Sequence, residues 1–132
     1  MEISKWQRRR FIPTWGDNDQ EDIPCVIIFR PPNVGWMSRW RELTLSSPQL
    51  DLEDGKMEES VKKIHQWAES IDAFRTEFLS DLIAAVEGLT RDDKAMTLEQ
   101  SLEFIQENEG LREEVFFALI AEGGLKKDQG KG

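Results

Sequence analysis

The sequence predicts an α+β fold, mostly α-helical, in which an N-terminal β-hairpin packs on a bundle of about four helices. Three observations lead to this fold class. Two short apolar segments near the N-terminus are bounded by prolines and separated by polar residues. A long central stretch repeats its apolar residues with an α-helical period, and two shorter amphipathic stretches follow it. We expect residues 1–125 to form one domain and residues 126–132 to form a flexible tail.

The predicted hairpin comes first in the chain. Residues 8–13 (RRRFIP) and residues 24–31 (PCVIIFRP) have the composition of strands, and the acidic loop of residues 16–22 separates them. The second strand is apolar at five consecutive positions, residues 25–29, so we expect both of its faces to be covered. Its β-branched side chains favour a strand over a short buried helix.

A short helix and a connector are predicted next. Trp36, Trp40 and Leu43 follow one another at positions i, i+4 and i+7, which is the spacing of one face of a helix. Residues 46–55 are mostly polar, begin with Ser-Ser-Pro and end at Asp-Gly. This composition is typical of a connector without regular structure.

The strongest local signal in the sequence begins at Met57. Apolar residues recur from Met57 to Val86 in eight steps over 29 residues, about 3.6 residues per step, which is the α-helical period. The pattern fits either one helix of about eight turns or two helices that meet near residues 73–76. We expect the helical stretch to end at Gly88 and a turn to follow at residues 91–94.

Two further helices are predicted at the C-terminal end. Thr97 and Gln100 have the spacing of a capping box, so a helix begins there. Its apolar stripe consists of Leu98, Leu102 and Ile105. Gly110 is expected to end this helix, and Gly123–Gly124 are expected to end a last helix that begins at Leu111.

The charge and the apolar runs of the chain argue against nucleic-acid and membrane partners. The 132 residues include 17 basic and 26 acidic ones, a formal net charge of −9, and the acidic excess lies in residues 46–132. Phosphate backbones repel such a chain, so we interpret the three arginines at residues 8–10 as protection of an edge strand. The longest apolar run, residues 25–29, is far shorter than the roughly 20 residues of a membrane-spanning helix.

No constellation in the sequence predicts catalysis, a metal site or a cofactor. Cys25 is the one cysteine and His65 the one histidine, which excludes an internal disulfide and multi-cysteine or HExxH zinc patterns. The acidic loop at residues 17–22 lacks the spacing of glycine and glutamate that a calcium loop needs. Motifs of nucleotide binding and of covalent hydrolysis do not occur. We therefore expect a protein that is not an enzyme and uses no cofactor.

The aromatic residues carry more information about function. The chain has five tryptophans and no tyrosine, and four of the tryptophans lie within residues 1–40. They either complete a small core or form an exposed anchor for another protein, because tryptophan is enriched at interface hot spots. Two adjacent phenylalanines near the C-terminus cannot both face the same side of a helix. The candidate protein-binding residues are Trp15, Trp36, Trp40, Phe116 and Phe117.

Three blocks of sequence, which together span most of the chain, carry a family resemblance. The first is residues 10–15 (RFIPTW) with a polar loop after it, and the second is residues 26–32 (VIIFRPP), which lead to a short tryptophan-containing segment. The third joins residues 86–89 (VEGL), residues 92–97 (DDKAMT) and residues 109–115 (EGLREEV) to a closing helix. In these blocks the chain resembles the tail assembly chaperones of long-tailed bacteriophages.

The resemblance implies a non-enzymatic function in the assembly of phage tails. Proteins of this family bind the long, apolar, helical tape measure protein in the host cytoplasm and keep it soluble. They also help to recruit subunits of the major tail tube protein, and they leave before the virion is complete. The alternative is a small structural neck or tail component, or a protein-binding adaptor, that stays in the particle. The sequence leaves open whether the chain forms a homo-oligomer.

Overall fold

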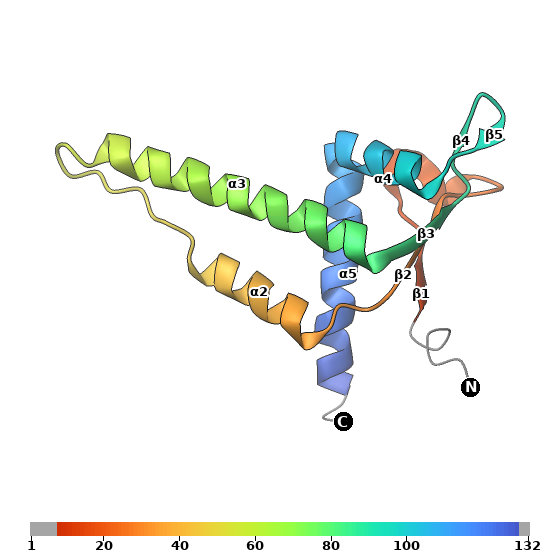
Figure 1. Ribbon diagram of the computed structural model, residues 1–132, viewed down its shortest axis with the longest axis horizontal. Coiled ribbons are helices and arrows are strands. Elements are labelled where there is room, and N and C mark those ends of the chain that lie inside the picture. The colour runs from red at the N-terminus through yellow and green to blue at the C-terminus, as the bar shows by residue number, and fades with distance from the viewer. Residues whose placement is uncertain (1–7, 130–132) are drawn as a thin grey trace.

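The computed structural model describes residues 8–129, most of which are helical. The predicted fold class, α+β and mostly α, is therefore confirmed. In chain order the elements are β1 (Arg9–Phe11), the 3₁₀ helix η1 (Trp15–Gln20), β2 (Val26–Phe29), α2 (Val34–Leu45), α3 (Met57–Leu82), β3 (Ile83–Glu87), β4 (Thr90–Arg91), β5 (Lys94–Ala95), α4 (Leu98–Glu107) and α5 (Glu109–Gln129). Figure 1 shows the sheet and the C-terminal helices at one end of the molecule, and α2 and α3 extending away from them.

The N-terminal hairpin pairs β1 with β2 in antiparallel register, as predicted, and β3 adds a third strand on the other edge of β2. The expectation of a helix up to Gly88 is wrong at this point, because the chain leaves α3 at Leu82 and enters β3. Val86 follows Leu82 at helical spacing, so the apolar pattern alone favours a helix. β2 lies at the centre of the sheet, where the backbone groups of both its edges need partners, and pairing with β3 supplies them.

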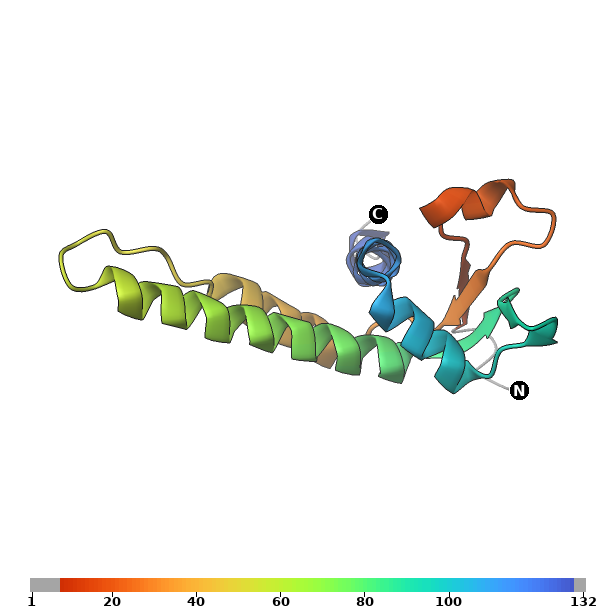
Figure 2. The ribbon, with the colours of Figure 1, turned by 90° about the horizontal axis from the view of Figure 1, so that it is seen from above.

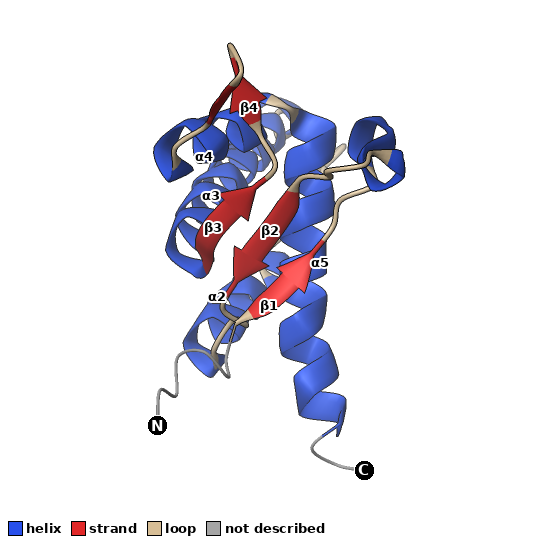
Figure 3. Cartoon of the chain, turned by 90° about the vertical axis from the view of Figure 1, so that its right-hand side faces the viewer, coloured by secondary structure: helices blue, strands red, loops and turns tan. Residues whose placement is uncertain are grey.

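Helices cover one face of this sheet (Figure 3). Phe11, Ile27 and Val86 are aligned across the three strands and pack in the core. The next residues along the strands point to the opposite face, where Ile28 is only partly buried. Val26 lies on the same face as Ile28 and is buried, at 6% exposed, so side chains on both faces of β2 are at least partly buried, as expected. No helix among residues 8–129 covers that second face.

The predicted turn at residues 91–94 is confirmed as the tight turn of the β4–β5 hairpin. Its two central residues, Asp92 and Asp93, have φ angles of 54° and 62°. Aspartate is among the few residues that adopt this left-handed conformation with little strain.

The core lies between the sheet and the helices. The aromatic rings of Phe29, Phe78 and Phe116, which come from β2, α3 and α5, are all fully buried. Aliphatic side chains fill the space around these rings, namely those of Ile27, Leu79, Ile105, Leu111, Val115 and Leu119. Burial of large apolar side chains from β2, α3, α4 and α5 supplies the main driving force for this arrangement.

α3 is one continuous helix of 26 residues, which decides between the two alternatives that the sequence left open. Its buried side chains are concentrated from Ile71 onward, where α3 packs on α2, α4 and α5. Its N-terminal half extends past α5 (Figures 1 and 2). The predicted non-helical connector of residues 46–55 is extended by one residue, and residues 46–56 return beside this half. We call Leu45 at the end of α2, the connector and residues 57–70 of α3 together the arm.

The capping box at the start of α4 is confirmed. The amide of Gln100 donates to Oγ1 of Thr97 at 3.1 Å, and the amide of Thr97 donates to Oε1 of Gln100 at 3.0 Å. The predicted end of this helix is wrong, because α4 ends at Glu107 and Gly110 already belongs to α5. A single extended residue, Asn108, makes the junction, and its side-chain amide donates to the carbonyl of Phe104.

α5 also differs from the prediction, because it continues through Gly123 and Gly124 to Gln129. A Cβ atom added at Gly123 would lie 2.7 Å from Sδ of Met37 and 2.9 Å from Cγ of Pro32. The glycine therefore allows close approach of α5 to the start of α2 and does not end the helix. Residues 126–129 of the predicted tail form the end of α5, and residues 130–132 lie outside the described residues.

Candidate functional site

Five aromatic side chains meet where α2 and α5 pack against α3. We call them the aromatic cluster, and its members are Trp36, Trp40, Phe74, Phe78 and Phe116. Trp40 stacks on Phe74 with ring centroids 5.6 Å apart and meets Phe116 edge-on at 5.0 Å. Trp36 meets Phe78 edge-on at 5.5 Å. Ring pairs in these geometries stabilise a contact beyond the area that they bury, so the cluster docks α2 on α3.

Two polar side chains beside the cluster, Trp36 and Arg39, have partners on α3. Nε1 of Trp36 donates to Oδ2 of Asp81 at 2.9 Å. The guanidinium of Arg39 lies 4.7 Å from the centroid of Trp36 and makes two hydrogen bonds to the carboxylate of Glu77, at 3.1 and 3.4 Å. Trp36 and Trp40 are half-buried in these contacts. The interpretation of the tryptophans as part of a small core therefore fits both residues.

The two adjacent phenylalanines have opposite environments. Phe116 is fully buried in the aromatic cluster, so its assignment to a partner-binding surface does not fit this structure. Phe117 is 47% exposed, and the guanidinium of Arg75 lies 5.5 Å from its ring centroid. As the sequence indicated, one of the two rings is exposed.

Trp15 is also exposed, but it belongs to a different part of the surface. It lies in η1, meets Phe104 of α4 edge-on at 6.0 Å, and is held by α5. Both carboxylate oxygens of Glu114 accept hydrogen bonds there, from the amide of Trp15 at 2.9 Å and from the amide of Thr14 at 2.6 Å. The five predicted binding residues therefore do not form one surface, because three belong to the aromatic cluster while Phe117 and Trp15 lie in other environments.

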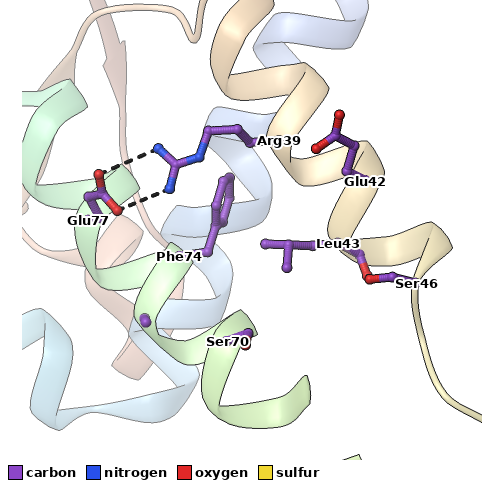
Figure 4. Close-up of a pocket in the computed structure, with 8 residues that line it drawn as sticks. Arg39, Glu42, Leu43, Ser46, Ser70, Phe74 and Glu77 are labelled. Carbon is purple, nitrogen blue, oxygen red and sulfur yellow. Dashed lines mark hydrogen bonds and ion pairs between the residues drawn. The ribbon is translucent and has the colours of Figure 1, made fainter. Parts of the chain in front are cut away.

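A groove of about 600 Å³ runs between α2 and α3 beside the aromatic cluster (Figure 4). Its lining combines the ring of Phe74 with the polar and aliphatic residues Arg39, Glu42, Leu43, Ser46, Ser70, Ala73 and Glu77. Figure 4 shows the Arg39–Glu77 pair beside Phe74, and Leu43 pointing from α2 toward Phe74 on α3. The lining therefore offers an aromatic ring, an aliphatic side chain and an ion pair as possible contacts for a bound segment.

The arm carries a group of exposed aliphatic side chains that the sequence analysis did not single out. These residues are Leu45 at the end of α2, Leu50 and Leu52 in the connector, and Met57 and Val61 in α3. Met57 and Val61 belong to the helical stripe that the sequence analysis followed from Met57 to Val86. The two leucines in an otherwise polar connector are the signal that could have revealed this surface.

Hydrogen bonds hold the arm in its conformation. Nε1 of Trp67 donates to the carbonyl of Leu43 at 2.8 Å, which joins the last turn of α2 to α3. The amide of Asp51 donates to Oγ of Ser60 at 3.0 Å, and Ser60 is buried beneath the connector. The exposed aliphatic residues therefore stand on a fixed scaffold, which lowers the entropic cost of binding a partner there.

The residues that could support catalysis are not brought together. Cys25 is buried at the start of β2, and burial raises the pKa of its thiol to about 11, so the thiol is protonated at neutral pH. His65 is exposed on α3. Within residues 8–129, no group of histidine, cysteine and acidic side chains is placed to hold a metal ion. No helix in the same range is long and apolar enough to cross a membrane.

Comparisons of the chain with protein-family models, with curated proteins and with solved structures find no match.

Proposed function

We propose that this chain is a non-enzymatic tail assembly chaperone of a long-tailed bacteriophage, which binds the helical tape measure protein and keeps it in solution. In this proposal it acts in the host cytoplasm, helps to recruit subunits of the major tail tube protein, and is absent from the finished particle. The family resemblance of the sequence suggests this client. The exposed aliphatic surface of the arm is the observation that carries the proposal.

The proposed client needs a partner because its helices are not yet packed. A long amphipathic helix that is not yet packed exposes an apolar stripe, and this stripe drives aggregation unless another apolar surface covers it. The arm offers exposed apolar side chains at Leu45, Leu52 and Val61, and the arm protrudes from the rest of the molecule (Figure 1). The chain has a net charge of −9, so complexes that contain it repel one another, and this repulsion opposes aggregation.

The test is co-expression of this chain with the tape measure protein, the large helical client that the resemblance implies. The proposal predicts that the large protein is found in the soluble fraction and co-purifies with this chain, and that it is insoluble when expressed alone. A large protein that stays insoluble in the presence of this chain would contradict the proposal. Stoichiometric amounts of this chain in purified virions would also contradict the proposal, because a structural tail component stays in the particle whereas a chaperone leaves it.

A further inference from the structure

One face of α3 is covered by α5 along only part of its length. At about 100° per residue, Met57, Val61 and Ala68 lie within about 40° of one another around α3. Arg75 continues the same face, and there Nη1 of Arg75 lies 3.9 Å from Oε1 of Glu109 on α5. Met57, Val61 and Ala68 themselves are exposed. The apolar stripe therefore lies on the face of α3 that contacts α5, and it extends along α3 beyond the place where α5 crosses.

The two helices form a corner on this face. Figure 2 shows α5 nearly end-on where it crosses α3, and the arm extends past it. On the side of α3 that faces α5, no other helix or strand among residues 8–129 lies beside the arm. The uncovered part of α3, residues 57–70, is about 20 Å long, which matches a partner helix of about four turns. Phe117 of α5 borders the same corner, because its ring contacts the guanidinium of Arg75. We call residues 57–70 of α3 together with residues 109–117 of α5 the arm corner.

The charged residues beside the stripe are mainly acidic. Glu58 and Glu69 lie along one side of it on α3, and Glu113 is an exposed residue in the α5 part of the corner. Lys62 and His65 also lie on this side of α3, and Lys63 on the other side pairs with Glu59 at 3.6 Å. The whole chain is acidic as well, with a net charge of −9. A partner with basic residues beside an apolar stripe would complement this surface, and an acidic partner would be repelled.

We infer that the arm corner binds an amphipathic α-helix with basic flanks, supplied by another protein. The inference rests on the proposed function in one respect, namely that the client is helical, and it adds the site and the charge of the bound segment. A second copy of this chain fits the corner less well, because α3, α4 and α5 are themselves rich in acidic residues. The basic residues Arg9 and Arg10 lie in strand β1 and so cannot present a helix.

Binding can be measured with synthetic peptides and the complete chain. The first peptide is an amphipathic helix of about 18 residues with leucines on one face and lysines on both flanks. The second replaces every lysine by glutamate, and the third contains the residues of the first in an order without an apolar face. Fluorescence anisotropy of labelled peptides gives the affinities. We expect the first peptide to bind at least about tenfold more tightly than the other two, and to bind less tightly as salt concentration rises.

Substitutions in the chain test whether the peptide binds at the arm corner. Val61→Asp should weaken binding of the basic peptide about tenfold, although it adds an attractive negative charge, because the apolar contact is lost. Leu98→Asp is the matched control, because Leu98 is 40% exposed, Val61 is 41% exposed, and Leu98 lies on α4 away from the corner. Met57→Asp is a second variant in case Val61→Asp disturbs the helix, and circular dichroism verifies the helix content of each protein. Glu113→Gln should weaken binding of the basic peptide two- to threefold, about as expected for one charge at the rim of an interface.

The outcomes separate this inference from the proposed function. Equal binding of the ordered and the scrambled basic peptides would overturn the inference, because charge alone would then account for it. Unchanged binding by both Val61→Asp and Met57→Asp would overturn it as well. If Val61→Asp still keeps the co-expressed tape measure protein soluble, the proposed function stands and the arm corner is not its site. If the basic peptide binds through Val61 while the tape measure protein stays insoluble with every variant, the arm corner stands and the proposed client is wrong.

Discussion

The guanidinium of Arg112 on α5 lies 2.5 Å from the carboxylate of Asp72 on α3, measured between Nη1 and Oδ1. Nη2 of the same side chain donates to the backbone carbonyl of Asp72 at 3.0 Å and to Oγ1 of Thr76 at 3.2 Å. Arg112 is buried, whereas Asp72 is exposed. These contacts fix the place where α5 crosses α3, and residues 57–70 of the arm lie immediately before this place in α3.

The first prediction compares the two partners of this ion pair. Asp72→Ala leaves the buried guanidinium of Arg112 without its main counter-charge, and we expect a loss of about 2–3 kcal/mol in the free energy of unfolding. Arg112→Met should cost less, because the remaining Asp72 carboxylate stays in contact with water. Urea denaturation measures both, with Glu69→Ala as the control for an exposed acid on the same helix. A larger loss for Arg112→Met than for Asp72→Ala would contradict this account.

The second prediction concerns Gly88, which follows β3 with a φ angle of +87°. A Cβ atom at this position would lie 2.3 Å from the backbone carbonyl oxygen of Pro24, which cannot move without disturbing β2. We expect Gly88→Ala to lower the free energy of unfolding by about 2 kcal/mol or more. Gly55→Ala is the matched control, because Gly55 has a φ of +81° but no atom within 4 Å of the added Cβ. Equal thermal shifts for the two variants would show that the contact with Pro24 is unimportant.

The third prediction separates core aromatic residues from surface ones. Trp40→Ala removes a ring that contacts Phe74 and Phe116, and we expect it to cost about 3–4 kcal/mol in stability. Phe117→Ala should cost about 1 kcal/mol or less, because nearly half of that side chain is in solvent. Chemical denaturation measures the free energy of unfolding of both variants. Similar losses would mean that α2 is not docked on α3 through Trp40.

The fourth prediction follows from the burial of Cys25, which raises the pKa of its thiol from 9.0 to about 11. In the unfolded chain the thiol loses its proton at lower pH than in the folded protein, so the folded protein binds more protons in this window. The free energy of unfolding therefore falls as pH rises from 9.0 to about 11, and below this window the contribution is fully present. Cys25→Ala should show a smaller fall over the same range in denaturation measured at several pH values. A parallel decline in both proteins would contradict the raised pKa.

The hairpin and the start of α4 could be predicted because short-range chemistry determines them. The prolines and the polar loop bound β2, and the Thr97 hydroxyl and Gln100 side chain cap the helix within a few residues. β3 could not be predicted in this way, because Leu82 and Val86 continue the helical spacing of α3. Pairing with β2, which lies far away in the sequence, overrides the local pattern there.

The candidate site was harder to predict than the fold. Trp36 and Trp40 have the same spacing whether their helix presents them to a partner or packs them on Phe74. In the folded protein both rings pack on Phe74. Val61 and Ile71 belong to one periodic stripe, yet Val61 is exposed and Ile71 is buried. The difference depends on where the rest of the fold covers α3, and no pattern within α3 records that position.

The most direct test of the central claim, that the arm is the surface that binds the helical client, is co-expression of the client with two matched double variants. Leu45→Ser with Leu52→Ser removes aliphatic side chains from the arm, whereas Ile23→Ser with Val34→Ser removes equally exposed ones elsewhere. The pairs are matched because Leu45 and Ile23 are each 80% exposed, and Leu52 and Val34 are 71% and 81% exposed. We expect the arm variant to fold but to lose the soluble client, and the control to retain it. Retention of soluble client by a folded arm variant would contradict the claim.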